Sequence, residues 1–556
     1  MENPIGSKER NAYYLLISLC ILVYLVGWQI PLMEIDAAQY ANISREMLLN
    51  KSYLMLFDRG KDYLDKPPML FWLSSLSMSV FGIGDMAYRL PSFLFSLLSI
   101  FSVYRLASLF YRARIALLSA LVLAACQAMF LINHDVRTDT MLMGWVIAAI
   151  WQLAEWFKTG KWRNLVFASV CIGGGMLTKG PIALIVPILS FSPHFLLQRS
   201  FRQFFRWEYL LVIIIIGVLL IPMSIGLYRQ FDLHPEKIMY GQRGISGLRF
   251  YYWTQSFGRI TGESTWHEND SFFFLFENML WGFLPWIIFF VTGLVYRCVQ
   301  LVRNKFIISK NEEWISPGGF LIAYCALASS RAQLPHYIYI VFPLAAIVTG
   351  KFLHDLLYTD IFKRMLKPLY ILHLIIYSLL LGALFLLITL PFPPVDWIAT
   401  SSAVVSLLLV FILLRKKILP LPPLVQIPVF TILIINIFID AVFYPRLLKY
   451  QMSIGVTAVI KEKKLNKDRF FIDMPDDEYT LHFYNNHFFK HLASADSLRT
   501  ADCLLVSKAG YDSLDKSKYT VIYEGEGFHV SQLSLSFLNP ATRKQETKPY
   551  FILKRN

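Results

Sequence analysis

Long apolar runs separated by short polar connections dominate the chain. Roughly thirteen of these runs are long enough to cross about 30 Å of hydrocarbon as helices. Their approximate limits are 13–32, 88–108, 115–132, 140–157, 164–178, 180–197, 209–228, 275–296, 315–330, 337–353, 369–391, 398–414 and 422–443. The pattern predicts a polytopic α-helical membrane protein.

The composition agrees with this prediction. Of the 556 residues, 56% are hydrophobic and only 16% are charged, whereas about 25% are charged in a typical soluble domain. The formal net charge of +15 would otherwise suggest a nucleic-acid partner. Here the basic residues fall in short clusters between apolar runs, so membrane topology explains them better, and we expect no nucleic-acid partner.

The positions of these basic clusters predict the orientation of the chain. They recur in every second connection, as expected for cytoplasmic loops. The clusters include Lys8 and Arg10, Arg112 and Arg114, Lys158 to Arg163, Arg199 to Arg206, Arg297 to Lys310, Lys363 to Lys367, and Arg415 to Lys417. We therefore expect a cytoplasmic N-terminus and, after an odd number of spans, a tail on the outer face.

Three regions on the outer face are too long to be simple turns: 33–87, 229–274 and the tail from about 444. The first is expected to contain interfacial helices. In the tail, "DRFFIDM", "DCLLVSKAG" and "YTVIYEGEGFHV" are strand-like, and "EYTLHFYNN" is typical of a helix. We therefore predict two units: a transmembrane domain over 1–443 and a small external α/β domain over 444–556.

The first outer region opens with "EIDAAQYANISREM", whose apolar residues recur at helical spacing. Asp36 stands near the start of this predicted helix, where it would either cap the helix or take part in chemistry. Farther on, "YLDKPPMLFW" places Lys66 before Pro67 and Pro68, which fix an extended backbone. Lys66 would either extend toward lipid headgroups or bind an anion.

The later outer connections also carry unusual charge. "NHDVRTDTML" concentrates charges between two apolar runs. Its Asp139 would either cap the next helix, beside an Arg137–Asp135 ion pair, or act in a site. Lys179 follows a glycine triplet in "CIGGGMLTKG", where its cation would bind a phosphate or anchor a helix end. Region 229–274 adds Arg259 and His267, and "QLPHYIYIVFP" adds Tyr337 at an outer helix end.

All of these groups are predicted on the same face of the membrane. Carboxylates, cations and a histidine beside apolar helix ends suit a reaction between an anionic lipid-linked substrate and a hydroxyl acceptor. A carboxylate would remove the acceptor proton, and cations would stabilise the departing phosphate.

Six motifs then give a family resemblance, which covers most of residues 1–350. "DAAQYANISREML", "YLDKPPMLFW", "GMLTKGPIAL", "FGRITGESTWH", "LPW" and "QLPHYIYIVFP" occur in the order seen in aminoarabinose transferases. The chain thus resembles the GT-C superfamily of polyprenyl-phosphate-dependent glycosyltransferases, which includes protein O-mannosyltransferases. The resemblance implies an inverting enzyme of the bacterial inner membrane with its active site on the periplasmic face.

The resemblance also implies roles for individual residues. Asp36 and Asp139 match acids of the first and second outer loops and are the catalytic candidates, with Asp36 as the base and Asp139 expected to orient the acceptor or assist Asp36. Lys66 matches a lysine that contacts the donor phosphate. The other donor phosphate-binding candidates are Lys179, Arg259 and Tyr337. His267 and Asp65 match a pair that resembles metal ligands, possible for zinc, although no cofactor is expected to be required.

Two departures bear on the substrates. Ala37 and Gln39 replace a glutamate and an arginine of the aminoarabinose enzymes. The sugar is therefore left open, and the acceptor would be lipid A, another envelope glycan or a protein. Two alternative hypotheses assign the chain to other classes of protein. One is a lipid or sugar transporter or flippase, and the other is a non-catalytic scaffold that presents the tail. Transporters often have internal repeats and midplane charges, whereas the charges here lie in the outer loops.

Overall fold

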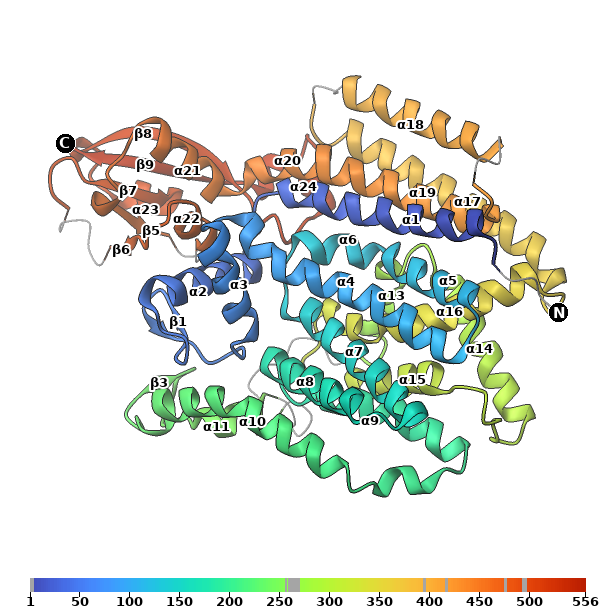
Figure 1. Ribbon diagram of the computed structural model, residues 1–556. Coiled ribbons are helices and arrows are strands. Elements are labelled where there is room, and N and C mark those ends of the chain that lie inside the picture. Colours follow the sequence, from blue (N-terminus) through green and yellow to red (C-terminus); the bar gives the residue numbers. More distant parts are fainter. Residues whose placement is uncertain are drawn as a thin grey trace.

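The computed structural model describes residues 5–255, 258, 271–393, 397–415, 419–474, 478–492 and 498–556. A bundle of long helices makes up most of the molecule, and a compact unit built on a β-sheet projects from one end (Figure 1). Helix α2 lies at this same end, and the N-terminus lies at the other.

The N-terminal half of the bundle begins with α1. Its helices are α1 (Ser7–Val26), α4 (Asp85–Phe110), α5 (Ala113–Ala124), α6 (Gln127–His134), α7 (Thr138–Thr159), α8 (Trp162–Lys179), α9 (Ile182–Leu197) and α10 (Tyr209–Leu227). Helices α5 and α6 occupy one predicted span but meet at an angle of 52°. The apolar run from 115 to 132 is therefore a bent pair instead of one straight helix.

The C-terminal half of the bundle extends from α13 to α19. Its helices are α13 (Phe274–Gly282), α14 (Ile287–Arg303), α15 (Ile315–Ala328), α16 (Phe342–Tyr358), α17 (Lys363–Thr389), α18 (Trp397–Arg415) and α19 (Pro423–Phe438). The predicted span 275–296 is interrupted between α13 and α14, where Pro285 lacks the N–H that a continuous helix needs. A 3₁₀ turn, Pro335–Val341, precedes α16.

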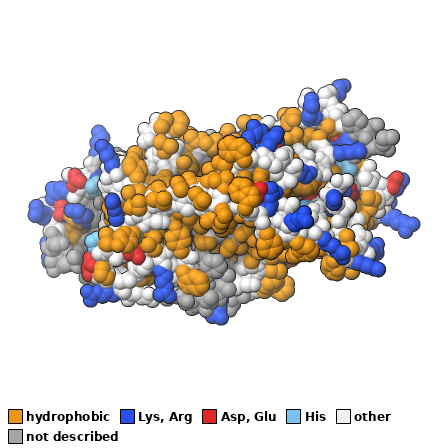
Figure 2. Space-filling model, turned by 60° about the horizontal axis from the view of Figure 1, so that its bottom comes forward, with side chains coloured by type: hydrophobic (Ala, Val, Ile, Leu, Met, Phe, Trp, Pro, Cys, Tyr) orange, Lys and Arg blue, Asp and Glu red, His pale blue; other side chains and the backbone are white. Residues whose placement is uncertain are grey.

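Helices of the described chain occupy all thirteen predicted segments. Seven of the described helices, counted with their adjoining turns, are long and apolar enough to cross a membrane, or eight if α5 and α6 form one span. Hydrophobic side chains cover the middle of the face in Figure 2, and charged side chains gather toward its two ends. These features make the chain a multi-pass membrane protein; the full count of thirteen spans stays a prediction.

Close packing of α8 against its neighbouring helices determines where Lys179 lies. A Cβ on Gly174 would lie 2.7 Å from the Trp145 ring, and a Cβ on Gly175 would lie 2.7 Å from the Ala183 Cβ. Contacts this short are forbidden to ordinary side chains, so the glycines allow α8 to approach α7 and α9. Lys179 is the last residue of α8.

The first outer region folds into α2 (Asp36–Asn50), a hairpin of β1 (Phe57–Asp58) and β2 (Lys61–Asp62), and α3 (Met69–Phe81). The amphipathic pattern predicts an interfacial helix at α2. In the structure, most of its side chains are buried, those of Asn42, Arg45 and Glu46 included. Protein covers α2 on several sides because both α3 and the tail pack against it.

The second outer region follows α10 and is short in regular structure. It contains a π-helical turn at Tyr228–Asp232, the hairpin of β3 (Ile238–Met239) and β4 (Gln242–Arg243), α11 (Gly247–Arg249), and a second π-helical turn at Phe250–Thr254. This region lies below α2 and the first hairpin in Figure 1. The two outer regions therefore face each other across the end of the bundle.

The tail contains a five-stranded sheet in the order β6-β5-β7-β9-β8. Strands β5, β6 and β7 are parallel, and β9 is antiparallel to both β7 and β8. Its elements are α20 (Tyr444–Leu447), α21 (Met452–Glu462), β5 (Phe470–Asp473), α22 (Tyr479–Tyr484), β6 (Lys490–His491), β7 (Cys503–Ser507), α23 (Lys508–Ser513), β8 (Tyr519–Gly527), α24 (Leu535–Leu538), α25 (Arg543–Glu546) and β9 (Lys548–Arg555). The division of the chain at residue 443 and the side on which the tail lies stay predictions.

Helix α22 joins the tail to α2 through polar contacts that involve the backbone. The Asn42 Nδ2 donates to the Tyr479 carbonyl at 2.6 Å, and the Arg45 guanidinium donates to the His482 carbonyl at 2.6 Å. The Thr480 N–H donates to Glu34 at 2.6 Å. Arg45 and Asn42 are fully buried, so their loss would leave unpaired backbone carbonyls inside the protein. Glu34, Asn42 and Arg45 thus fix the tail against the first outer region.

Candidate active site

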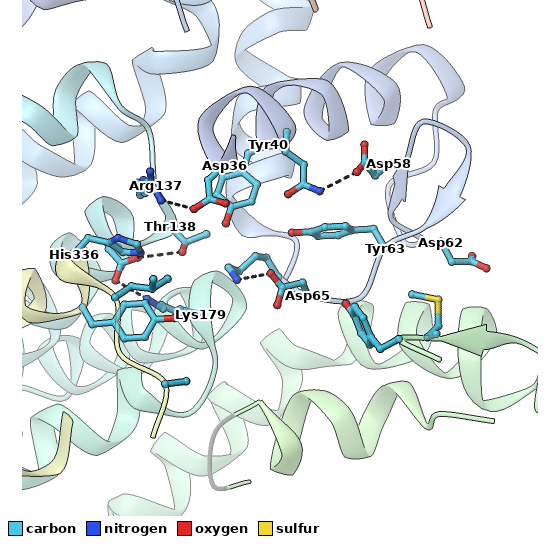
Figure 3. Close-up of a pocket in the computed structure, with 18 of the residues that line it drawn as sticks. Asp36, Tyr40, Asp58, Asp62, Tyr63, Asp65, Arg137, Thr138, Lys179 and His336 are labelled. Carbon is cyan, nitrogen blue, oxygen red and sulfur yellow. Dashed lines mark hydrogen bonds and ion pairs between the residues drawn. The ribbon is translucent and has the colours of Figure 1, made fainter. Parts of the chain in front are cut away.

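A cavity of about 420 Å³ opens between the two outer regions and the helix ends beneath them (Figure 3). Six parts of the chain supply charged or polar walls to it: the start of α2, the β1–β2 hairpin with the loop after it, the connection into α7, the end of α8, the β3–β4 hairpin, and the segment before α16. The charged residues that line it are Asp36, Asp58, Lys61, Asp62, Asp65, Lys66, Arg137, Asp139 and Lys179, with His336 beside them.

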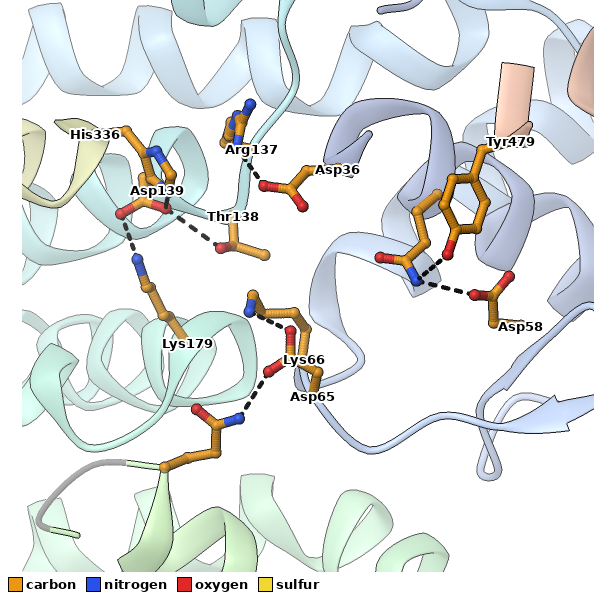
Figure 4. Close-up of polar contacts among 12 residues, drawn as sticks. Asp36, Asp58, Asp65, Lys66, Arg137, Thr138, Asp139, Lys179, His336 and Tyr479 are labelled. Atoms are coloured by element: carbon orange, nitrogen blue, oxygen red, sulfur yellow. Dashed lines mark hydrogen bonds and ion pairs between the residues drawn. The ribbon is translucent and has the colours of Figure 1, made fainter. Parts of the chain in front are cut away.

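Asp36 enters the cavity from the first turn of α2. The helix N-cap is Ile35, and no side chain caps this end. The capping alternative is therefore not what the structure shows; instead, the Asp36 carboxylate accepts a hydrogen bond from the Arg137 guanidinium. Arg137 also donates through Nε to Asp135 at 3.0 Å. The Arg137–Asp135 ion pair that the sequence suggested is thus present. Arg137 also reaches Asp36, as Figure 4 shows.

Asp139 lies deeper, in the first turn of α7. Its Oδ1 accepts from the Lys179 Nζ at 2.6 Å, and its Oδ2 lies 3.6 Å from the His336 Nε2. The Asp139 side chain is only 3% exposed. The N-cap of α7 is Arg137, without a side-chain cap, so Asp139 does not cap the helix. The Lys179 ammonium also lies 3.7 Å from the centre of the Tyr337 ring, a cation–π contact.

Lys66 points into the cavity from the loop before α3, instead of extending toward headgroups. Its Nζ donates to Asp65 at 2.5 Å, and the other Asp65 oxygen accepts from the Gln255 Nε2 at 2.7 Å. Burial opposes the charged lysine, but the negative charge of Asp65 outweighs it and raises the Lys66 pKa well above its ordinary value. Lys66 is therefore a permanent cation at neutral pH.

The rim of the cavity joins it to the tail. The Gln39 Nε2 donates to Asp58 at 2.9 Å and to the Tyr479 hydroxyl at 3.1 Å. The Arg59 guanidinium donates to the same hydroxyl at 3.2 Å and lies 4.4 Å from the centre of that ring. Asp62 accepts from Gln230 at 2.8 Å, and Lys237 pairs with it at 2.8 Å. Tyr479 thus belongs to the support of the site, although it lies 440 residues from Gln39.

The structure brings together Asp36, Asp65, Lys66, Asp139, Lys179 and Tyr337, six of the eight residues singled out in the sequence. The other two, Arg259 and His267, lie outside the described residues. The roles of all eight stay predictions. Arg137, His336 and Tyr479 were not among the eight. Arg137 and His336 had local signals, because Arg137 stands two residues before Asp139 and His336 stands next to Tyr337 in "QLPHYIYIVFP"; Tyr479 had none.

The proposed metal pair of His267 and Asp65 cannot be completed within the described residues. Both Asp65 oxygens already accept hydrogen bonds from nitrogen donors. Among the described residues there is no group of three His, Cys, Asp or Glu side chains that could hold a metal ion. Asp65 as it stands therefore fits the role of a partner for Lys66 better than that of a ligand.

The chemistry available in the cavity follows from its charges. Three cations, Lys66, Arg137 and Lys179, face a common space, and each has a carboxylate partner (Figure 4). Fixed cations of this kind bind phosphate and stabilise a departing phosphate oxygen. A carboxylate within the same cavity can accept a proton from a hydroxyl group. The arrangement suits displacement of a phosphate by an oxygen nucleophile.

Comparison with known proteins gives a consistent result. The family model for dolichyl-phosphate-mannose-protein mannosyltransferase matches residues 65–225. The undecaprenyl phosphate-α-4-amino-4-deoxy-L-arabinose arabinosyl transferase of Wigglesworthia glossinidia brevipalpis is 26% identical over 368 residues, 62% of this chain and 60% of that protein. Its counterpart in Erwinia tasmaniensis is 29% identical over 286 residues, 50% of this chain. The match covers 60% and 49% of the length of these two relatives.

Solved structures extend the likeness to almost the whole chain. The crystal structure of ArnT from Cupriavidus metallidurans bound to undecaprenyl phosphate matches with a TM-score of 0.71 and 19% identity, over 92% of this chain and 96% of that one. The apo form of the same protein gives a TM-score of 0.69. The chain therefore has a GT-C fold, and the resemblance to aminoarabinose transferases drawn from the six motifs is confirmed.

Proposed function

We propose that this chain is an inverting glycosyltransferase that moves a sugar from a polyprenyl phosphate, such as undecaprenyl phosphate, to an envelope acceptor. One observation carries the proposal: a cavity with Lys66, Lys179 and Arg137 beside Asp36 lies at one end of a GT-C bundle. The named activity of the curated relatives and the undecaprenyl phosphate in the ArnT crystal structure support the choice of donor.

The roles of the residues follow from charge and position. Lys66 is a permanent cation and holds the donor phosphate, with Lys179 and Arg259 as further cations and Tyr337 behind Lys179. Asp36 is the most exposed acid of the three carboxylate–cation pairs, at 35%, and acts as the base. Asp139 is buried between Lys179 and His336, so it orients Lys179 instead of meeting the acceptor.

The reaction is a single displacement. Asp36 takes the proton of the acceptor hydroxyl while the hydroxyl oxygen forms a bond to the anomeric carbon of the sugar. The bond from that carbon to the phosphate oxygen breaks, and the polyprenyl phosphate leaves with the bonding electron pair, stabilised by Lys66. Attack from the side opposite the phosphate inverts the anomeric centre. The acceptor is a hydroxyl or phosphate group of lipid A, another envelope glycan or a protein.

The active site is proposed to face the periplasm, with the protein in the bacterial inner membrane. The cavity is built from the connections that the basic loops place on the outer side. A reporter fusion after residue 556 tests this orientation. An alkaline phosphatase fusion should be active because that enzyme needs the oxidising periplasm. If the fusion is inactive and the tail is protected from external protease, the tail lies in the cytoplasm and the predicted orientation is wrong.

The decisive experiment measures sugar transfer. Membranes containing the full chain are incubated with radiolabelled sugar on a polyprenyl phosphate, together with lipid A, envelope glycans or protein fractions as separate acceptors. We expect labelled acceptor of inverted anomeric configuration. A product of retained configuration would exclude single displacement. Labelled donor that crosses sealed vesicles without any transfer would instead support the transporter alternative.

A further inference from the structure

The three carboxylate–cation pairs of the cavity are held with different firmness. In the deepest pair, Lys179 is fixed by Asp139 and by the Tyr337 ring, while Asp139 also faces His336. In the second, Asp65 holds Lys66 with one oxygen and Gln255 with the other. Breaking the deepest pair would leave opposite charges apart inside the protein, because the Asp139 side chain is only 3% exposed. Moving Asp65 away from Lys66 would also disturb its contact with Gln255.

The third pair is different. Asp36 is 35% exposed, and among the described residues Arg137 is the one side chain that hydrogen-bonds or ion-pairs with it. Arg137 has a second carboxylate, because its Nε donates to Asp135 at 3.0 Å. A guanidinium offers five donors in a fixed fork. Arg137 can therefore release Asp36 and remain neutralised by Asp135, with its terminal nitrogens free for another anion.

A phosphate in the cavity is a suitable competitor for those nitrogens. It lines up with an arginine fork through two oxygens, and it carries at least as much charge as a carboxylate. In Figure 4, Arg137 and Asp36 lie side by side, and Lys66 lies below them across the cavity. The Asp36 oxygen that accepts from Arg137 becomes available to another donor, such as an acceptor hydroxyl, once Arg137 turns away.

We propose that Arg137 couples donor binding to catalysis: the donor phosphate draws the Arg137 fork away from Asp36 and so releases Asp36 to act as the base. This inference rests on the proposed function and adds an order to it. Before the donor arrives, Asp36 is restrained and cannot activate a hydroxyl group or water. After it arrives, Arg137 remains bound to Asp135 and joins Lys66 in holding the phosphate.

The test uses binding alone and needs no acceptor. Polyprenyl phosphate of defined chain length is titrated into the detergent-purified full chain, with the matching uncharged polyprenol as reference. Arg137→Gln should weaken phosphate binding by about tenfold or more, as expected for a lost charge-assisted contact. Asp36→Asn should tighten binding of polyprenyl phosphate by about three- to tenfold. The reason is that Arg137 no longer has to break its partly exposed ion pair with Asp36 before it contacts the phosphate.

The double variant separates release of Arg137 from a general gain in positive charge. Combined with Arg137→Gln, Asp36→Asn should no longer tighten binding. Asp62→Asn removes another carboxylate of the same cavity, one held by Lys237, and is the matched control; it should change affinity by less than about twofold. If Arg137→Gln does not fold, Arg137→Lys replaces it, because one ammonium cannot serve Asp135 and the phosphate through separate nitrogens.

Each outcome decides between the two proposals. Tightening by Asp36→Asn that disappears in the double variant supports the coupling. Unchanged binding in Asp36→Asn, or tightening that persists in the double variant, overturns the coupling and leaves the glycosyltransferase proposal standing. A wild-type chain that binds polyprenol as well as it binds polyprenyl phosphate would contradict the proposed donor itself, and the coupling with it.

Discussion

Two ion pairs in the same cavity, Asp36–Arg137 and Asp139–Lys179, each join an aspartate to a basic side chain but differ in their surroundings. In the outer pair, the Asp36 side chain is 35% exposed and contacts Arg137 alone among the described side chains. In the inner pair, Asp139 is 3% exposed and serves Lys179 and His336 together. Burial and the number of partners thus differ between the two acids. We therefore propose that Asp36 reacts once Arg137 releases it and that Asp139 supports the wall of the cavity.

The largest expected effect is on catalysis, at the outer pair. Asp36→Asn keeps the size of the side chain but removes its ability to take a proton. Sugar transfer should fall by about 10²- to 10⁴-fold, the usual contribution of a general base. Initial rates of transfer in membranes with matched amounts of protein would measure this loss. Wild-type transfer by the variant would exclude Asp36 as the base.

The same substitution at the inner pair should instead reduce stability. Asp139→Asn leaves the Lys179 ammonium without its counter-ion in a largely buried position, which costs about 3 kcal/mol. Unfolding by heat or SDS in detergent would show the difference, whereas Asp36→Asn should change stability by less than about 1 kcal/mol. Adding Lys179→Met to Asp139→Asn removes the unpaired cation and should restore part of the loss. Equal stability of the two single variants would end the distinction between the pairs.

Lys66 provides a third pair with which to extend the comparison. Lys66→Ala should weaken binding of polyprenyl phosphate by about 10- to 150-fold, equivalent to roughly 1.5–3 kcal/mol for a charge-assisted contact. Lys66→Arg should rescue binding only in part, since a planar fork replaces a point charge. Binding of polyprenol is the control, since it should not change. Normal phosphate affinity in the alanine variant would remove Lys66 from the donor site.

The smallest effect is expected at the contact between the tail and the rim. Tyr479→Phe removes the hydroxyl that accepts from Gln39 and Arg59 but keeps the ring beneath the Arg59 guanidinium. Each such hydrogen bond contributes about 0.5–1.5 kcal/mol. We expect a two- to tenfold rise in the KM for the donor with little change in kcat, because the rim is loosened while Asp36 stays in place. An unchanged KM would separate the tail from the function of the cavity.

Much of the bundle could be predicted from the sequence because apolar runs of sufficient length must form helices in a membrane, where the backbone has no other hydrogen-bonding partner. The breaks within the predicted spans were harder to predict from the sequence. The bend between α5 and α6, for example, lies in an apolar run without a proline. Such a bend depends on how neighbouring helices pack, and periodicity does not report packing.

The individual charged residues of the cavity were also visible in the sequence, because charges beside apolar spans are costly and therefore informative. Apart from the Arg137–Asp135 ion pair, their pairing was not predicted. Asp36 and Arg137 are 101 positions apart, and Asp139 and Lys179 are 40 apart. For each acid the sequence left open either helix capping, a local interaction, or a role in a site, and the structure shows long-range ion pairs without a side-chain cap. Only the tertiary structure could decide this, because the choice depends on which cations the fold brings within reach.

From the sequence alone follow the class of the molecule and the chemistry predicted for its outer loops: hydropathy predicts the spans, basic clusters predict their direction, and six motifs carry the resemblance to aminoarabinose transferases. The difference between the two acids became visible only in the folded chain. Asp36 and Asp139 carry the same carboxylate in similar local settings, each in the first turn of a helix. Their burial and partners come from segments distant in the chain, and these set the free energy of releasing a charge.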